Sequence, residues 1–293
     1  MASDITHLAF SDEHNYDSGS GRFGSIALIT MKKDSYKTVS SSITNAITEA
    51  GVTRTEFKWT ETKRANHKKA AIKLVDLSVK LALNAHVRID VILWDYKDAR
   101  HNITDRDSIK NFHIMYYRLL TNTLHKFWPD GSIWILYPDE ISCVNWGDVQ
   151  SFSNIKSVKR TEETLFQLSE ALKSYHVRQI KQVSSKESPV SLIADLFAGL
   201  IPYSRYCYDK YEAIKIEKEG GSLFELSKVE ITNSDRCRYE IITQFLKHKE
   251  KQKLGISFES SRGFRSYNPS QDFPLNFWWY EPQSEIDKAP IKR

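Results

Sequence analysis

With 293 residues, of which 40% are hydrophobic and 12% aromatic, the chain can bury a sizeable core in one or two domains. Charged residues make up 27% of it and the formal net charge is +5, which is compatible with a polyanionic partner without requiring one. Cys143, Cys207 and Cys237 form no zinc-binding spacing, so we expect reduced thiols in a cytoplasmic protein. The longest apolar segment, residues 190–201, is too short to span a bilayer, and the polar N-terminus does not resemble a signal peptide.

Hydrophobic periodicity predicts an α/β protein that begins with a strand pair. Strands are expected over residues 5–12 and 22–31, and the turn-rich loop between them favours antiparallel pairing. A helix over 36–50 would end at Gly51. The elements expected next are a helix over 62–84, a strand over 87–95, a helix over 107–127, a strand over 132–138, a helix over 161–174, a strand over 176–183 and a helix from Pro189 onward.

This alternation of strands and helices requires crossover connections, so we expect a mixed central sheet with helices on both faces. Beyond residue 213 the periodicity weakens to a basic helix over 234–253 and irregular strands over 256–281. We therefore expect a core over residues 1–212 and a basic, aromatic C-terminal α+β extension over 213–293 that packs on it.

Acidic residues end three of the predicted strands. Asp12 and Glu13 end the first, Asp95 ends the strand over 87–95, and Asp139 follows the strand over 132–138. Strand ends cluster at one edge of a sheet, so these acids should lie near one another there. The alternative for Asp12 is an ordinary turn acid that caps local amides.

Two further acids have unusual surroundings. Asp195 lies inside the apolar segment 190–201, next to small residues that would let the helix approach the sheet closely. An ionised carboxylate buried there costs several kcal/mol unless a cation or hydrogen bonds compensate it. Glu56 lies two residues before Lys58 and could share a face with it, so the alternative to metal binding by Glu56 is a surface ion pair with Lys58. Carboxylates from separate elements are the ligands that Mg²⁺ and Mn²⁺ prefer, and a two-ion site of this kind can hydrolyse phosphodiesters.

These residues resemble the prokaryotic family called domain of unknown function 3800, which has a ribonuclease H-like fold. The family's opening Asp-Glu-Ser-Gly reads Asp12-Glu13-His14-Asn15 here, its Glu-x-Lys motif is similar to residues 56–58, and its closing motif is similar to residues 184–199. His14 and Asn15 replace the family's Ser and Gly, Leu192 replaces a Gln, and no Asp precedes the first Ser of the closing motif, but the candidate acids match. The resemblance implies a metal-dependent nuclease site, whose catalytic and metal-binding residues would be Asp12, Glu56, Asp139 and Asp195, with Asp95 as the alternative strand-end ligand.

The leading hypothesis is a nuclease that uses Mg²⁺ or Mn²⁺ to cleave DNA or RNA, with Lys58 contacting phosphate. One alternative is a non-catalytic module on the same fold that binds nucleic acid, a protein partner or a second copy of itself. A third reading is a phosphohydrolase that acts on small molecules. No nucleotide-cradling glycine motif and no serine-nucleophile motif is present in the chain.

The C-terminal region carries further candidates for nucleic-acid binding. Lys249 and Lys251 lie on the predicted basic helix, and Arg262 and Arg265 alternate with aromatic residues. Phosphates attract the basic groups and bases can stack on the rings, so we expect this region to form a wall of the substrate groove. The alternative is that the aromatic residues pack on the core and the lysines form a solvated face.

Overall fold

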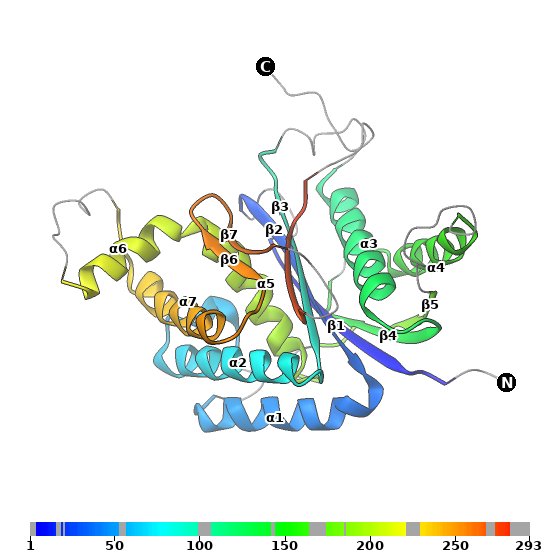
Figure 1. The fold of residues 1–293 in the computed structure, drawn as a ribbon, viewed down its shortest axis with the longest axis horizontal. Helices are drawn as coiled ribbons and strands as arrows, with labels where there is room; N and C mark the ends of the chain where they lie inside the picture. Colours follow the sequence, from blue (N-terminus) through cyan, green and yellow to red (C-terminus); the bar gives the residue numbers. More distant parts are fainter. Residues whose placement is uncertain are drawn as a thin grey trace, which may run out of the picture.

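The computed structural model describes residues 4–15, 19, 21–52, 57–98, 107–141, 144–163, 174–184, 186–220, 229–267 and 273–281. Its centre is a six-stranded mixed sheet in the order β5-β4-β1-β2-β3-β8 (Figure 1). The strands of this sheet are β1 (His7–His14), β2 (Phe23–Lys32), β3 (Arg88–Asp95), β4 (Ser132–Pro138), β5 (Tyr175–Ile180) and β8 (Leu275–Trp279).

Strand direction places three of the predicted acids at one edge. β1 and β2 pair antiparallel, as predicted, and β2 pairs antiparallel with β3. β4 runs parallel to β1, β5 runs parallel to β4, and β8 runs parallel to β3. Every strand of the sheet except β2 therefore points the same way, and the carboxyl ends of β1, β3 and β4 lie along a common edge.

Helices cover both faces of the sheet. The helical segments are η1 (Lys33–Ser35), α1 (Tyr36–Glu49), η2 (Trp59–Glu61), α2 (Ala65–Leu83), α3 (Ser108–Phe127), α4 (Trp146–Glu163), α5 (Ser191–Tyr206), α6 (Tyr208–Lys218) and α7 (Asn233–Lys251). The predicted mixed α/β class is confirmed. None of the described helices is both long and apolar enough to cross a membrane.

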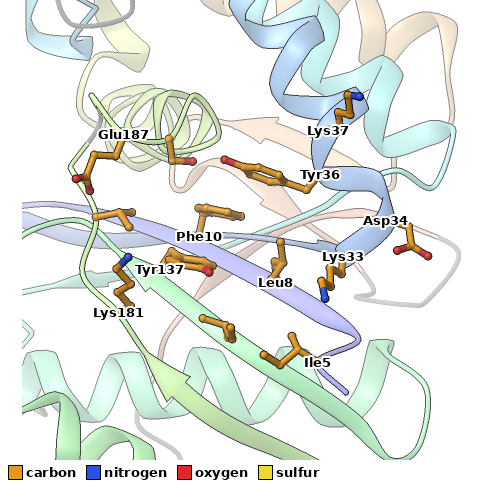
Figure 2. A pocket seen from close by; sticks show the side chains of 13 residues that line it. Ile5, Leu8, Phe10, Lys33, Asp34, Tyr36, Lys37, Tyr137, Lys181 and Glu187 are labelled. Carbon is orange, nitrogen blue, oxygen red and sulfur yellow. The ribbon is translucent and has the colours of Figure 1, made fainter. Parts of the chain in front are cut away.

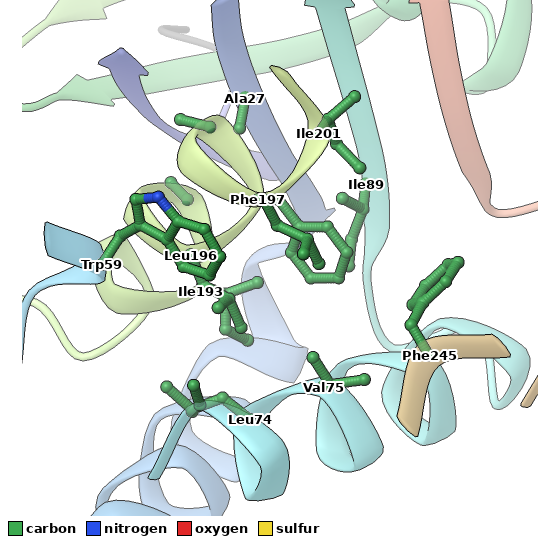
Figure 3. Close-up of a cluster of buried hydrophobic side chains, with 14 of the residues drawn as sticks. Ala27, Trp59, Leu74, Val75, Ile89, Ile193, Leu196, Phe197, Ile201 and Phe245 are labelled. Carbon is green, nitrogen blue, oxygen red and sulfur yellow. The ribbon is translucent and has the colours of Figure 1, made fainter. Parts of the chain in front are cut away.

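Two hydrophobic cores hold these layers together. In the larger core, α5 packs directly on β1 and β2, and α1, α2 and α7 enclose it from outside. Figure 3 shows Ile193 of α5 facing Leu74 and Val75 of α2, and Ile201 of α5 beside Ile89 of the sheet. The smaller core lies on the opposite face, where α3 and α4 cover Trp134 and its neighbours. α5 is apolar on almost all sides, which suits a helix that is buried between the sheet and the outer helices α1, α2 and α7.

The C-terminal segments belong to these same layers. α7 packs on α2, and β8 extends the sheet beside β3. A buried ion pair fixes this strand: the carboxylate of Asp90 accepts hydrogen bonds from Arg88 Nε at 2.9 Å and from Asn276 Nδ2 of β8 at 3.1 Å. The hairpin of β6 (Ile256–Glu259) and β7 (Gly263–Ser266) packs on α5. The boundary expected at residue 212 falls inside α6.

The structure describes only the first residues of one expected helix, and those residues belong to a helix that begins earlier in the chain. The sequence predicts a helix over 161–174, whereas α4 spans Trp146–Glu163. The segment that forms α4 is mostly polar, and Val149 and Trp146 are its hydrophobic side chains described as packing in the smaller core, so hydrophobic periodicity gave little signal. Most of the expected range, residues 164–173, lies outside the described residues.

Candidate functional site

Asp12 and Asp139 lie side by side at the carboxyl ends of two parallel strands. In the β1–β4 register Ser11 is opposite Pro138, and the N–H of Asp139 continues this ladder by donating to the Ser11 carbonyl at 2.8 Å. The Asp12 side chain is only 5% exposed. Parallel pairing thus brings together two acids that are 127 residues apart in the chain.

Asp195 reaches the same edge from α5. Small residues let this helix lie close to the sheet, where Ser25 of β2 donates a hydrogen bond to the Ala198 carbonyl at 2.6 Å. The backbone N–H of Trp59 donates to Asp195 Oδ2 at 2.8 Å, which fixes the carboxylate. The predicted close approach of this helix to the sheet is therefore confirmed.

The charges of the acids act on one another. Burial, and then the charges of Asp195, Glu13 and Asp139, raises the pKa of Asp12 well above its usual range. Burial and the charge of Asp139 raise the pKa of Glu13 to about 8, and burial raises the pKa of Asp195 to about 6. The ammonium group of Lys58 opposes these shifts and lowers the pKa of all three carboxyls. We refer to Asp12, Glu13, Asp139 and Asp195 as the acidic cluster.

Two carboxylate oxygens of the acidic cluster are buried without a partner. Among the described residues, neither Asp12 Oδ2 nor Glu13 Oε2 has a hydrogen bond. An unsatisfied buried acceptor costs about 1–3 kcal/mol and more when it is charged, so such atoms in a folded protein call for a ligand or for a proton. The donor set of oxygens alone fits a hard divalent cation. As the side chains stand, however, the described ranges contain no group of three acids, histidines or cysteines that could hold an ion.

The other two predicted ligands are not part of this cluster as described. Glu56 lies outside the described residues. Asp95 ends β3, which β2 separates from β1, and its Oδ2 forms an ion pair with Arg22 at 2.8 Å. Asp139, rather than Asp95, is therefore the strand-end acid beside Asp12.

Of the predicted phosphate-binding residues, Lys58 lies near the acids, because its charge lowers the pKa of Asp12, Glu13 and Asp195. Arg238 of α7 lies over the ring of Trp59, whose backbone N–H binds Asp195. Lys249 follows Arg238 by eleven residues, which is about 16 Å along the helix, and Lys251 lies further along it. Arg262 forms an ion pair with Glu281 at 3.1 Å. Arg265 is in β7, whose neighbour Phe264 donates its N–H to Ser204, nine residues after Asp195 on α5. Among the described residues, no hydrogen bond or ion pair joins any of these four residues to the acidic cluster.

A pocket that the sequence did not reveal adjoins the cluster, and we call it the Arg238 pocket. It has a volume of about 380 Å³. The Arg238 guanidinium lies over the rings of Trp59 and Tyr203, 4.9 and 4.6 Å from their centroids. Burial, and then the charge of Arg238, lowers the pKa of His14 to about 4, so this histidine is neutral at pH 7. The pocket is lined by His14, Asn15, Gly21, Arg22, Phe23, Trp59, Pro202, Tyr203, Tyr206 and Arg238.

The fold and the site define an α/β protein with a buried acidic cluster at the carboxyl edge of a mixed sheet. No family model matches the chain. It is 31% identical over 299 aligned residues to "Uncharacterized protein ORF2" of Methanothermobacter thermautotrophicus, and the alignment covers all of both chains. "Uncharacterized protein ORF2'" of the same organism matches equally well. The chain therefore belongs to the family of these ORF2 proteins.

We expect the acidic cluster to make the metal-free protein less stable as the pH rises. The pKa of Glu13 is raised from 4.5 to about 8, so between these values the folded state binds more protons than the unfolded state. The stability that this group contributes is present below about pH 4.5 and is lost as the pH rises through about 8. In EDTA, the Tm of wild type minus that of Glu13→Gln should fall steadily between pH 5 and 8.5. The exposed Glu140→Gln is the control, and a Tm difference for Glu13→Gln that does not change with pH would contradict the expectation.

Proposed function

We propose that this protein is a divalent-metal-dependent nuclease on a ribonuclease H-like scaffold, acting on the phosphodiester bonds of DNA or RNA. The observation that carries the proposal is the convergence of Asp12, Asp139 and Asp195 from two strands and a helix, with unpartnered buried carboxylate oxygens beside Lys58. Mutual repulsion among buried acids is destabilising in itself, and a bound cation would remove it. The resemblance of the Asp12-Glu13 and Asp195 motifs to the domain of unknown function 3800 family supports the same function.

In this proposal each residue has a defined task. Asp12, Asp139 and Asp195, together with Glu56, would hold Mg²⁺ or Mn²⁺, and the Trp59 N–H keeps the Asp195 carboxylate in place. The bound ion would activate water and offset charge that develops on the phosphate. Lys58 contributes a cation for the phosphate next to the acids. The buried Cys207 and Cys237 are free thiols, which fits a protein of the reducing cytoplasm.

The test is cleavage of labelled single- and double-stranded DNA and RNA by the purified protein. We expect cleavage in Mg²⁺ or Mn²⁺ and none in EDTA. The same ions should raise the Tm, because a ligand that binds only the folded state stabilises it: about 2.7 kcal/mol at 100 times the Kd. A protein that cleaves no nucleic acid and whose Tm does not respond to either ion is not a metal-dependent nuclease.

The second candidate is a non-catalytic nucleic-acid-binding module. It is favoured by the absence, among the described residues, of three potential ligands that are close enough to hold an ion. This candidate predicts that nucleic acid binds with the same affinity in EDTA and in Mg²⁺, without cleavage in either. The two candidates therefore differ in whether Mg²⁺ or Mn²⁺ leads to cleavage of the nucleic acid.

A further inference from the structure

An open groove on the face of β1 and β4 leads to the acidic cluster. It has a volume of about 810 Å³ and lies between η1 and α1 on one side and the segment before α5 on the other (Figure 2). In the part of the chain that the structure describes, α5 covers β1 and β2, whereas Ile135 and Tyr137 of β4 stay partly exposed on this face. The lining residues are Ile5, Leu8, Phe10, Lys33, Asp34, Tyr36, Lys37, Ile135, Tyr137, Lys181, Val183, Glu187 and Ser188.

Three stacked aromatic rings form part of the groove. The rings of Tyr36 and Phe10 are 5.7 Å apart at an interplanar angle of 11°, and those of Phe10 and Tyr137 are 5.0 Å apart at 17°. Phe10 is buried between the two tyrosines, which are partly exposed. Figure 2 shows the tyrosine rings on either side of Phe10. Partly exposed, nearly parallel rings of this kind are platforms on which unpaired bases stack.

The edges of the groove carry positive charge. The ammonium groups of Lys33, Lys37 and Lys181 have no ion pair with any described residue, and these lysines are exposed. Two acids, Asp34 and Glu187, also line the groove, so the lysines outnumber the carboxylates there. Lysines without a carboxylate partner are available to bind phosphates, with release of counterions.

The groove, the acidic cluster and the Arg238 pocket follow one another along β1. Alternate residues of a strand share a face, so Phe10 in the groove is followed by Asp12 in the cluster and then by His14 in the pocket. Successive residues on one face of a strand are about 6.6 Å apart along it. β4 repeats the pattern, because Tyr137 in the groove is followed by Asp139. A linear polymer that extends from the groove along β1 therefore reaches the acidic cluster next.

We infer that the groove binds a single strand of nucleic acid and leads it to the acidic cluster. The inference rests on the proposed function and adds the form of the substrate. Unpaired bases stack on Tyr36 and Tyr137, and phosphates contact Lys33, Lys37 and Lys181. In a duplex the base faces are already stacked on one another, so the rings have nothing to bind.

The inference is tested by fluorescence anisotropy of a labelled oligothymidylate and of a labelled oligouridylate, with the full-length protein in EDTA so that no cleavage occurs. We expect the double variant Lys33→Glu/Lys37→Glu and the single variant Lys181→Glu each to weaken binding at least tenfold. The double variant should lower the salt slope by about 1.4, since each phosphate contact contributes about 0.7 for single strands. Tyr137→Ala should weaken binding by about fivefold to a hundredfold through lost stacking, and Tyr137→Phe should retain wild-type affinity. Lys80→Glu, an exposed lysine on α2, is the charge-matched control.

The outcomes separate this inference from the proposed function. Groove variants that bind single strands with wild-type affinity and salt slope would overturn the inference, even in a protein that cleaves nucleic acid. Equal affinity of the wild type for a duplex of the same length would also overturn it. Weakened binding in the lysine and Tyr137→Ala variants, with Tyr137→Phe and Lys80→Glu unaffected, would support the inference, and a protein that then cleaves nothing in Mg²⁺ or Mn²⁺ would refute the nuclease alone. The exposed positions of the lysines leave the fold intact, and an unchanged Tm verifies this.

Discussion

Asp12→Asn is expected to reduce cleavage by at least about a hundredfold and, at the same time, to raise the Tm of the metal-free protein. The amide keeps the volume of the side chain but removes the charge that would hold Mg²⁺ or Mn²⁺. It also removes a buried carboxylate whose pKa is raised by burial and by its acidic neighbours, so a destabilising charge is lost. A gain of about 1–3 kcal/mol is expected at pH 8 from the usual cost of an uncompensated buried group.

Asp95→Asn is the matched control, because Asp95 also ends a strand at this edge but pairs with Arg22. It should keep cleavage within a few fold of wild type. Initial cleavage rates in Mn²⁺, and the Tm in EDTA and in Mn²⁺, should be measured for the wild type, for Asp12→Asn and for Asp95→Asn. Cleavage that survives Asp12→Asn but is lost in Asp95→Asn would move the site to β3. A lower metal-free Tm for Asp12→Asn would contradict the electrostatic argument.

Much of the architecture could be predicted from the sequence because it depends on local periodicity. The strands β1 and β3 and the helix α2 each have apolar positions at the spacing typical of a strand or of a helix. The position of Asp139 beside Asp12 followed from one further rule, that neighbouring strand ends meet at a sheet edge. The place of Asp195 followed from small residues on an apolar helix.

What failed or was missed depends on contacts between distant segments. Lys249 belongs to the predicted basic helix, but its distance from the acids depends on how α7 lies against α2. The aromatic stack of the groove joins Tyr36 of α1 to Phe10 and Tyr137 on two strands, and no local pattern links these three positions. The sequence identifies Glu13 as a strand-end acid beside Asp12, but the predicted metal ligands did not include it.

Gly199→Ala is expected to have the second large effect, on stability and on the site together. A Cβ at Gly199 would overlap the indole of Trp59, whose Nε1 would lie 2.5 Å away. Trp59 is only 2% exposed and is enclosed by the larger core, so it cannot move aside freely. Overpacking of this kind costs about 1–3 kcal/mol or more, and each kcal/mol lowers the Tm by about 2–4 °C in a domain of this size range.

A displaced Trp59 would also move its backbone N–H away from Asp195, where it now lowers the pKa of that carboxyl. We therefore expect Gly199→Ala to need more Mn²⁺ for half-maximal cleavage, measured by metal titration at a temperature where the variant is folded. Gly147→Ala is the control, because its Cβ would meet only Asn145 Oδ1, at 3.3 Å. Combining Gly199→Ala with Trp59→Leu tests the cause: a smaller side chain relieves the overlap, so the double variant should lose less stability than the sum of the single variants. Additive losses would show that Gly199 acts through a contact other than Trp59.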